Sequence, residues 1–295
     1  MNRDVSWDLY RTFGAVLGEG SLSGASRLLG ITQPSVARHI DALEASLGVS
    51  LFVRTPRGLS PTDAALDLKP HADRLASTAA AFLRTAQGST GEVRGTVRLS
   101  ASEIVGTVHL PPILAAMRLK YPDLAIELVL SNAADDLLER EADIAIRMFR
   151  PTQNALVARR IGAFEIGLHA HPDYLARRGV PKAMDDLKDH DLIGYDLETP
   201  ALRAFLEPYP ALRREAFSLR ADSDVAQLAA IRAGYGIGVC QVAVAIQEPR
   251  LTRVLSAAFT ADLETWVVMH EDMKTNARCR VVFDELVERL SVQAR

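Results

Sequence analysis

The sequence is poor in the residues that build disulfide, metal and membrane-spanning structures. Its 295 residues include two cysteines, Cys240 and Cys279, which are far apart and form no CxxC pair. Disulfide scaffolds and zinc modules need closely spaced cysteines, so we interpret both thiols as core residues in a reducing cytoplasm. No apolar run approaches the roughly 20 residues that cross a bilayer, and the N-terminus lacks a signal peptide. We therefore predict a cytoplasmic protein with no membrane partner.

Motifs of common enzymes are missing as well. The sequence has no GxSxG, no phosphate-binding loop and no HExxH. The glycines of residues 234–238 follow an expected helix and precede an expected strand, whereas a dinucleotide-binding fingerprint needs the opposite order. His169 and His171 would share one face of a strand, but no third metal ligand is evident beside them. We predict a protein that is not an enzyme and that has no cofactor and no metal.

The most informative segment begins at Leu22, ends at Asp41 and reads LSGASRLLGITQPSVARHID. It predicts two short helices joined by a tight turn at Gly30, where glycine adopts the required torsions easily. Thr32 is a suitable N-cap for the second helix, as Ser6 and Ser21 are for the two helices before it. Apolar residues recur along the second helix at helical spacing and are expected to be buried: Val36, Ile40, Leu43 and Leu47. This pattern predicts a helix-turn-helix, whose second helix enters a DNA major groove.

The outward face of the second helix then carries Pro34, Arg38 and Asp41, with Ser35 on its flank. Arg38 can make a bidentate hydrogen-bonded contact with guanine, which is worth about 1–3 kcal/mol of discrimination between bases. Ser35 can donate to a base edge or a phosphate. Asp41 would repel phosphates unless it faces away or pairs with a neighbour. The net charge of −3 means that DNA affinity must come from local arginines rather than from an overall field. The alternative is an amphipathic helical domain with a solvated face.

Residues 51–62, which read LFVRTPRGLSPT, predict a small β-wing with Arg54 and Arg57 at its tip. Such a tip suits phosphates or a narrow minor groove, where negative potential attracts arginine. The alternative is an ordinary exposed turn. Ser60 and Pro61 are expected to cap and begin the helix that follows.

From Pro61 to about Gly88 the sequence predicts one long helix, bent at Pro70. Apolar residues recur at alternating spacings of three and four along it, as in a coiled-coil seam: Ala65, Leu68, Ala72, Leu75, Ala79, Phe82 and Ala86. We predict a homodimer held by Leu68, Leu75 and Phe82, and a two-fold dimer predicts an inverted-repeat DNA site. The alternative is a helix packed on its own domain.

Strands and helices alternate after a short hinge at residues 87–91, which predicts an α/β domain with a largely parallel sheet. The first expected elements are a strand over 97–100, a helix over 111–120, a strand over 125–130, a helix over 133–140 and a strand over 143–147. The pattern restarts near Ile166 and predicts a second lobe, with crossovers near residues 163–165 and 262–265. We expect a DNA-binding domain over 5–62, a linker helix and hinge over 63–90 and an effector-binding domain over 91–295. Its first lobe would span 91–163 and 266–295, and its second lobe 164–265.

Ligands of open α/β sheets bind beyond the carboxyl ends of the strands. The polar residues and tight turns expected there form our candidate effector site: Ser100, Ser102, Glu103, Ser131, Asn132, Arg147, Gly194, Tyr195, Asp222 and Ser223. Ser102 is expected to cap the following helix, whose N–H groups could hold a carboxylate together with Arg147. A small carboxylate metabolite is therefore the first candidate, while Glu103 keeps a zwitterion or another polar ligand open. The alternative is that the serines are only caps and Arg147 pairs with a structural acid.

Residues 5 to about 88 closely resemble the N-terminal region of LysR-type transcriptional regulators. The matching sequence is GSLSGASRLLGITQPSVARHIDALEASLGVSLFVRTPRGLSPT, in which the LE…LG…LF.R phrase that starts at Leu43 and Glu44 is especially characteristic. YPDLAIEL, EADIAIR, HPDYLARRGVP and AGYGIGVC resemble the same family, so that the likeness covers nearly the whole chain. One departure is Ala37, where the family usually has serine, and another is Gln241, where it usually has proline.

The resemblance implies an α/β protein with an all-α winged helix-turn-helix, a long linker helix and a two-lobed effector domain like a periplasmic solute-binding protein. By position, it implies DNA contacts at Gln33, Pro34, Ser35, Arg38 and Arg57. It also implies a linker-helix dimer, pairing of dimers into a homotetramer, and contact with RNA polymerase.

Together these features predict a transcriptional regulator that binds double-stranded DNA and is switched by a small-molecule effector. A cytoplasmic small-molecule sensor with weak or vestigial DNA binding is the alternative. Alanine variants of Arg38 and Arg57 discriminate between them, because a regulator would lose operator binding and keep ligand binding.

Overall fold

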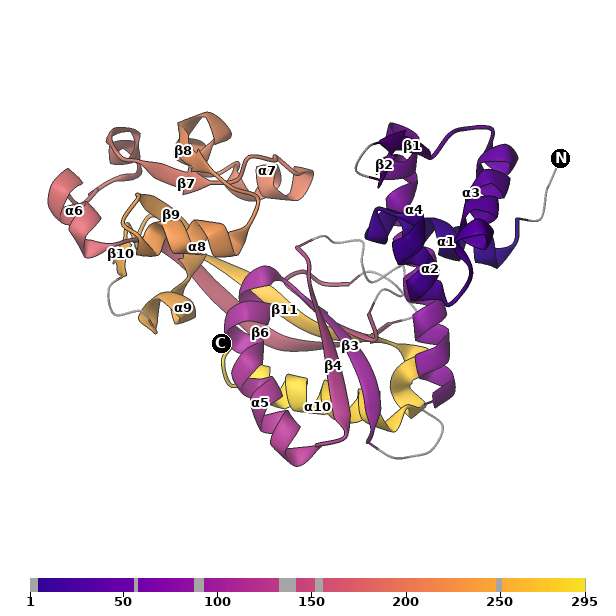
Figure 1. Cartoon of the computed structure of the whole chain (residues 1–295). Coiled ribbons are helices and arrows are strands. Elements are labelled where there is room, and N and C mark those ends of the chain that lie inside the picture. The colour runs from indigo at the N-terminus through magenta and orange to yellow at the C-terminus, as the bar shows by residue number, and fades with distance from the viewer. Residues whose placement is uncertain are drawn as a thin grey trace. The chain divides into compact units, whose positions relative to one another are not determined.

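The computed structural model describes residues 5–55, 58–87, 93–132, 142–151, 156–247 and 251–294 (Figure 1). The chain divides into two compact units, the first largely residues 1–87 and the second largely residues 88–295. The expected helix over 133–140 and the wing residue Arg57 lie outside the described residues.

The first unit opens with three short helices, α1 (Trp7–Glu19), α2 (Leu22–Leu29) and α3 (Gln33–Leu47). Each begins at the expected cap, because the side-chain oxygens of Ser6, Ser21 and Thr32 accept hydrogen bonds from backbone N–H groups of the first turns. Gly30 ends α2 at a φ of +67°, in the left-handed region that glycine adopts at little cost. The predicted helix-turn-helix is confirmed.

Val36, Ile40 and Leu43 of α3 are buried as expected and pack with Phe13 and Val16 of α1. The prediction for Leu47 is wrong, because its side chain is 42% exposed. It stands in the last turn of α3, directly before Gly48 turns the chain out of the helix, so that it extends past the core.

The wing is a two-stranded antiparallel sheet of β1 (Phe52–Thr55) and β2 (Gly58–Pro61). The cap prediction at Ser60 and Pro61 is wrong, since these residues pair with Val53 and Phe52 in the wing. Helix α4 (Asp63–Gln87) begins later, and the hydroxyl of Thr62 accepts a 3.3 Å hydrogen bond from the Ala65 N–H. Pairing of Ser60 and Pro61 with residues seven and nine positions earlier thus overrides a local helix-start signal.

The second unit is built on one mixed sheet. Among the described residues nine strands form this sheet. Eight of them follow one another in the order β4-β3-β5-β11-β6-β9-β7-β8, and the ninth, β10, pairs with the last residues of β6. The strands are β3 (Gly95–Ala101), β4 (Leu124–Leu130), β5 (Ile144–Arg147), β6 (Leu156–Ala170), β7 (Leu192–Gly194), β8 (Phe217–Arg220), β9 (Ile237–Gln241), β10 (Thr252–Val254) and β11 (Ala261–His270).

The helices between the strands are α5 (Leu110–Lys120), α6 (Pro172–Arg178), α7 (Pro200–Leu206), α8 (Asp224–Arg232), α9 (Val242–Ile246) and α10 (Ala277–Ser291). A π-helical turn, η2 (Val105–His109), leads into α5, and short 3-10 turns occur at η4 (Met184–Asp189), η5 (Pro210–Leu212), η6 (Arg214–Ala216) and η7 (Glu271–Thr275).

The prediction of a largely parallel sheet holds for the two ends of the sheet and not for its middle. Strand β3 is parallel to β4 and β5, and β7 is parallel to β8 and β9. The middle is the long antiparallel pair of β6 and β11, which runs from one half of the unit to the other (Figure 1). The two expected crossovers lie inside these strands, where Ala163 pairs with Glu264 and Glu165 with Asp262. The crossovers pair with each other, so they continue the sheet instead of interrupting it.

Two buried apolar cores lie on either side of this pair. The first core contains residues of β3, β5, α5 and α10, such as Leu99 and Phe283, and the second contains residues of α6, β7, β8 and β9, such as Tyr174 and Phe217. We call the two halves the first lobe and the second lobe. Polar residues stand at the strand ends between these cores.

Candidate DNA-binding surface and effector cleft

The outward face of α3 presents the residues predicted to contact DNA. Gln33, Pro34 and Arg38 are exposed, and Ser35 is half-buried. The Arg38 Nη2 donates to the Ser35 Oγ at 3.1 Å, and that hydroxyl also lies 2.9 Å from the Thr32 Oγ1. Two of the predicted contact residues are therefore held together on one turn of the helix.

Arg54 lies exposed on β1 of the wing. The wing is attached to the helices beneath it, because the Leu59 N–H donates to the Gly20 carbonyl at 3.2 Å. Gly58, with a φ of +126°, leaves no room for a side chain there, since an added Cβ would lie 3.0 Å from the same carbonyl. A closely packed wing holds β1, the strand that carries Arg54, at a set place in the first unit.

Glu44 is a structural residue that the sequence marked only through its family phrase. Its Oε1 accepts hydrogen bonds from the N–H groups of Leu51 at 2.6 Å and Phe52 at 3.2 Å. Leu51 is fully buried, so no water replaces the carboxylate there. Glu44 thus joins the last turns of α3 to the start of the wing.

Replacing Glu44 with alanine is expected to lower the free energy of unfolding by about 2 kcal/mol, because two backbone N–H groups lose a charged acceptor. Glu44→Gln keeps an acceptor oxygen without the charge and should lose about half as much. Urea titration followed by circular dichroism measures both. Asp67→Ala on the exposed side of α4 is the matched control and should stay within about 0.5 kcal/mol of the unchanged chain. Equal stability of the Glu44→Ala and Asp67→Ala variants would contradict this role.

The predicted dimerisation seam divides into two parts along α4. Leu68 and Ala72 are half-buried against the core of the first unit. Leu75 and Phe82 are 39% and 74% exposed. The alternative of a helix packed on its own domain therefore describes the first half of α4, while the second half presents an open apolar stripe.

In the second unit, Ser100 and Arg147 are buried at the ends of β3 and β5. The Arg147 Nη2 donates to the Ser100 Oγ at 2.9 Å, and its Nη1 donates to the Ile146 carbonyl at 3.1 Å. Ser131 is placed beside them, since its N–H donates to the Ala101 carbonyl. These residues are brought together as expected, with Arg147 bound to the protein itself.

The expected cap at Ser102 is wrong. Its Oγ is buried and has no hydrogen-bond partner among the described residues, and only its carbonyl joins the next turn, by accepting from the Gly106 N–H. The adjacent Glu103 points to the other lobe instead. Its Oε2 accepts from the Ser223 Oγ at 2.8 Å and from the Val225 N–H at 3.3 Å.

Three more residues at this edge have defined partners. Asp222 Oδ1 accepts from the N–H groups of Asp196 and Leu197, which holds the loop after β7. The Tyr195 hydroxyl donates to Asp224 Oδ1. Gly194 has no room for a side chain, because a Cβ there would lie 2.3 Å from the Phe217 ring.

Asp224 belongs to the cluster and was not among the predicted residues. Besides the bond from Tyr195, its Oδ2 accepts from the Asn132 Nδ2 at 3.1 Å. The sequence could have pointed to Asp224 through its position next to the predicted Ser223, in the first turn of α8. Burial first, and then the charge of Glu103, raise the pKa of Asp224, and burial with the charge of Asp224 raises the pKa of Tyr195, which stays a neutral donor.

His169, Cys240 and His171 serve packing and capping. The His169 Nδ1 lies 2.9 Å from the Gly167 carbonyl and 3.3 Å from the Cys240 Sγ, and burial lowers the pKa of the imidazole. Burial also raises the pKa of the Cys240 thiol to about 12, so it is an unreactive thiol at neutral pH. The His171 Nδ1 accepts from the Asp173 N–H and caps α6. No group of three potential metal ligands occurs within the described ranges.

Gln241, the departure from the family's usual proline, is buried at the end of β9. Its Oε1 lies 2.7 Å from the His109 Nε2, and the His109 Nδ1 lies 2.8 Å from the Gln293 Oε1. The His109 ring stacks on Phe164 of β6, with centroids 4.6 Å apart. This departure therefore changes a buried contact between the lobes, and not only a loop.

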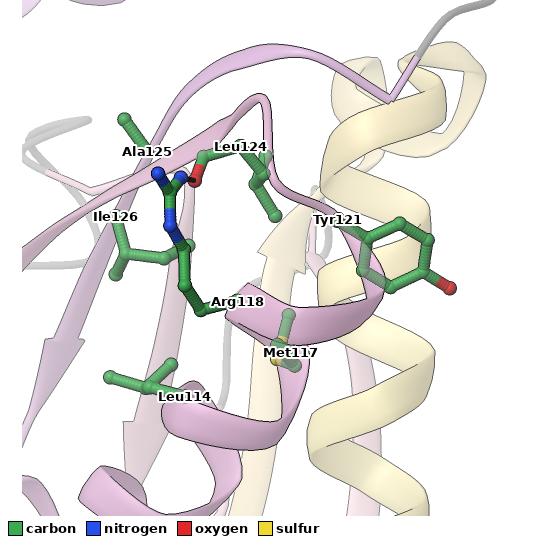
Figure 2. Close-up of a pocket in the computed structure, with 7 residues that line it drawn as sticks. All are labelled: Leu114, Met117, Arg118, Tyr121, Leu124, Ala125 and Ile126. Atoms are coloured by element: carbon green, nitrogen blue, oxygen red, sulfur yellow. Dashed lines mark hydrogen bonds between the residues drawn. The ribbon is translucent and has the colours of Figure 1, made fainter.

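A pocket of about 240 Å³ lies away from these polar residues, where α5 faces the edge strand β4 (Figure 2). Its lining is mostly apolar and consists of Leu114, Met117, Arg118, Tyr121, Leu124, Ala125 and Ile126. Arg118 donates to the Leu124 carbonyl at 3.3 Å across it. A membrane span needs a helix of a certain length and apolarity. In the described part of the chain, no helix is long and apolar enough to cross a membrane.

The fold is thus that of a winged helix-turn-helix followed by a two-lobed α/β domain, and comparison with known proteins identifies the family. Residues 7–66 match the model for the bacterial regulatory helix-turn-helix protein, lysR family. Residues 90–291 match the model for the LysR substrate binding domain. The chain belongs to the LysR family of transcriptional regulators.

Individual relatives agree with this assignment. The chain is 31% identical over 182 residues to an HTH-type transcriptional regulator of Xanthomonas campestris pv. campestris, which covers 60% of this chain and 52% of the relative. The match therefore spans about half the length of that relative. The structure of CrgA, a LysR-type transcriptional regulator from Neisseria meningitidis, is similar with a TM-score of 0.60 at 28% identity, over 97% of this chain and 99% of CrgA. Full-length CbnR complexed with its target DNA shares the fold, with a TM-score of 0.63 at 20% identity over 96% and 99% of the two chains.

Proposed function

We propose that this chain is a sequence-specific DNA-binding transcriptional regulator whose activity a small molecule controls. The observation that carries the proposal is α3, a capped helix that buries one face in the helix-turn-helix core and presents Arg38 and Ser35 on the other. A helix of this kind delivers side chains to base edges in a major groove. The matched relatives are named as transcriptional regulators, which supports a role other than catalysis.

DNA contact falls on Gln33, Pro34, Ser35 and Arg38, with Arg54 of the wing beside them and Arg57 by its position in the sequence. CbnR was crystallised with its target DNA, which supports a DNA-binding role for a chain of this fold. Leu75 and Phe82 form the open part of the dimerisation seam, and two such chains would present two recognition helices to an inverted repeat. Pairing of dimers into tetramers and contact with RNA polymerase are the further steps that we assign to the cytoplasmic regulator.

In this proposal the DNA-binding domain spans residues 5–62, the linker helix and hinge span 63–90, and the effector-binding domain spans 91–295. The effector is held between the two lobes of the effector-binding domain. The residues that would face the effector are Ser100, Ser102, Glu103, Ser131 and Arg147 of the first lobe, and Gly194, Tyr195, Asp222 and Ser223 of the second. An effector that binds one relative arrangement of the lobes more tightly than another would shift the population toward it.

The direct test is selection of binding sites from a library of random double-stranded DNA with the full chain at low salt. We expect an enriched motif with two-fold symmetry. Ligands found by thermal-shift screening of metabolites should then change the DNase I footprint on that motif. The proposal fails if no sequence is enriched, or if ligands bind and leave both the footprint and transcription unchanged.

A further inference from the structure

We propose that Glu103 is a built-in carboxylate that occupies the N-terminus of α8 and holds the two lobes together without an effector. The effector-related part of this inference rests on the proposed function. The N-terminus of a helix has unpaired N–H groups and a partial positive charge, so it favours an anion. In this chain the anion comes from the first lobe of the same molecule.

The contact has the geometry of a charge-assisted helix cap. Ser223 is the N-cap of α8, because its Oγ accepts from the Ala226 N–H at 3.2 Å. The same hydroxyl donates to the Glu103 Oε2 at 2.8 Å, and the Val225 N–H donates to that oxygen at 3.3 Å. One carboxylate oxygen thus receives two donors from the second lobe.

The backbone that carries Glu103 is itself seated on the second lobe. The next residue, Ile104, is 8% exposed and packs in an apolar cluster with Ile193 of β7 and with Leu228 and Ile231 of α8. Val108, one turn later, packs against the same cluster. Because apolar burial places this turn against α8, the Glu103 carboxylate reaches the helix end without an extended, mobile arm.

A second connection runs in parallel. The Glu103 N–H donates to the Asn132 Oδ1 at 3.1 Å, and the Asn132 Nδ2 donates to the Asp224 Oδ2, which ties the end of β4 to α8. Asn132 is exposed, so water competes for these bonds and they hold the lobes less firmly than Glu103 does. Glu103 takes part in both of these connections, whereas the buried His109–Gln241 pair joins the lobes separately.

The sequence suggested an effector carboxylate at the helix after Ser102, beside Arg147. The N-terminus of α8 is a different position that favours an anion, on the second lobe, and Glu103 already fills it. An effector does not need a carboxylate at α8 for the lobes to meet, and a chain without Glu103 should have a vacant site for one. Removing the side chain should let the two lobes move apart, and a small free carboxylate should bring them together again.

The test uses the full chain with two introduced cysteines, Leu119→Cys on α5 and Ala201→Cys on α7, both exposed and one in each lobe. The native thiols of Cys240 and Cys279 are 8% and 1% exposed and will not compete for spin labels. Mixing the labelled chain with an excess of unlabelled chain isolates the distance within one molecule, which pulsed electron paramagnetic resonance measures.

In the Glu103→Ala variant the distance distribution should broaden and shift to longer distances, and acetate or formate should reverse the shift. Glu103→Gln keeps one acceptor oxygen, so its distance should lie between that of the unchanged chain and that of Glu103→Ala. Glu127→Ala on the exposed edge strand β4 removes the same charge elsewhere and should leave the distance unchanged, and circular dichroism confirms that each variant is folded. An unchanged distance in Glu103→Ala, or an opening that acetate does not reverse, overturns the proposal. Neither DNA nor an effector is present, so this result is independent of the site-selection experiment.

Discussion

Replacing Arg38 with alanine is expected to weaken binding of the selected DNA by about 30-fold or more. A bidentate arginine–guanine pair is worth about 1–3 kcal/mol, and a dimer on an inverted repeat makes two of them. Arg38 is exposed, and its side chain donates to the Ser35 hydroxyl on the surface of α3, so its loss leaves the helix-turn-helix core intact. Fluorescence anisotropy with a labelled site at fixed salt measures the change.

Two further variants separate base recognition from charge. Arg38→Lys keeps the positive charge and loses the planar fork, so it should bind the selected site and a scrambled site with similar affinity. Arg203→Ala removes a charge from α7 of the second unit and should leave DNA binding unchanged. If Arg38→Ala binds the selected site as well as the unchanged chain does, α3 does not read the bases through this residue.

Replacing Phe82 with aspartate is expected to separate the dimer and to weaken binding to the inverted repeat by about a hundredfold or more. Phe82 is 74% exposed, so the change creates no cavity within one chain, but a dimer would have to bury two carboxylates in an apolar seam. Two linked half-sites typically gain 10²–10⁴ in affinity over one, which sets the scale of the expected loss at about that range. Sedimentation equilibrium gives the mass and anisotropy gives the affinity.

The matched control is Val180→Asp, which places the same charge at a 59% exposed apolar position after α6. It should leave both the mass and the affinity unchanged. Leu75→Asp, 39% exposed on the same stripe of α4, should reproduce the effect of Phe82→Asp. Retention of the dimer by both α4 variants would mean that another surface pairs the chains.

Local signals predicted the first unit well. The caps at Ser6, Ser21 and Thr32 and the turn at Gly30 depend on bonds between residues a few positions apart, and the structure has all four. The one failed helix start, at Ser60, is also the one place where a neighbouring strand competed for the same residues. Local chemistry decides an element when no distant partner offers its backbone a better set of bonds.

For the second unit, the sequence predicted where most strands and helices lie, and it predicted less well which of them pack together. Alternating strands and helices located most of its strands, but they gave no sign that β6 and β11 pair along their whole length. Nothing in the sequence indicated that the Phe217 ring packs against Gly194 and leaves no room for a side chain there. Glu103 was recognised as out of place in an anion-binding pocket, and its partner on α8 could not be found from the sequence.

The sequence alone determined that this chain has a helix-turn-helix and an α/β domain of the LysR type, because periodicity and capping act over a few residues. The tertiary structure decided which half of the α4 stripe stays open, how the crossovers join the sheet, and where the Glu103 carboxylate lies. The last of these joins residues 120 positions apart in the chain. Such contacts follow from how whole elements pack, and local spacing carries no record of that packing.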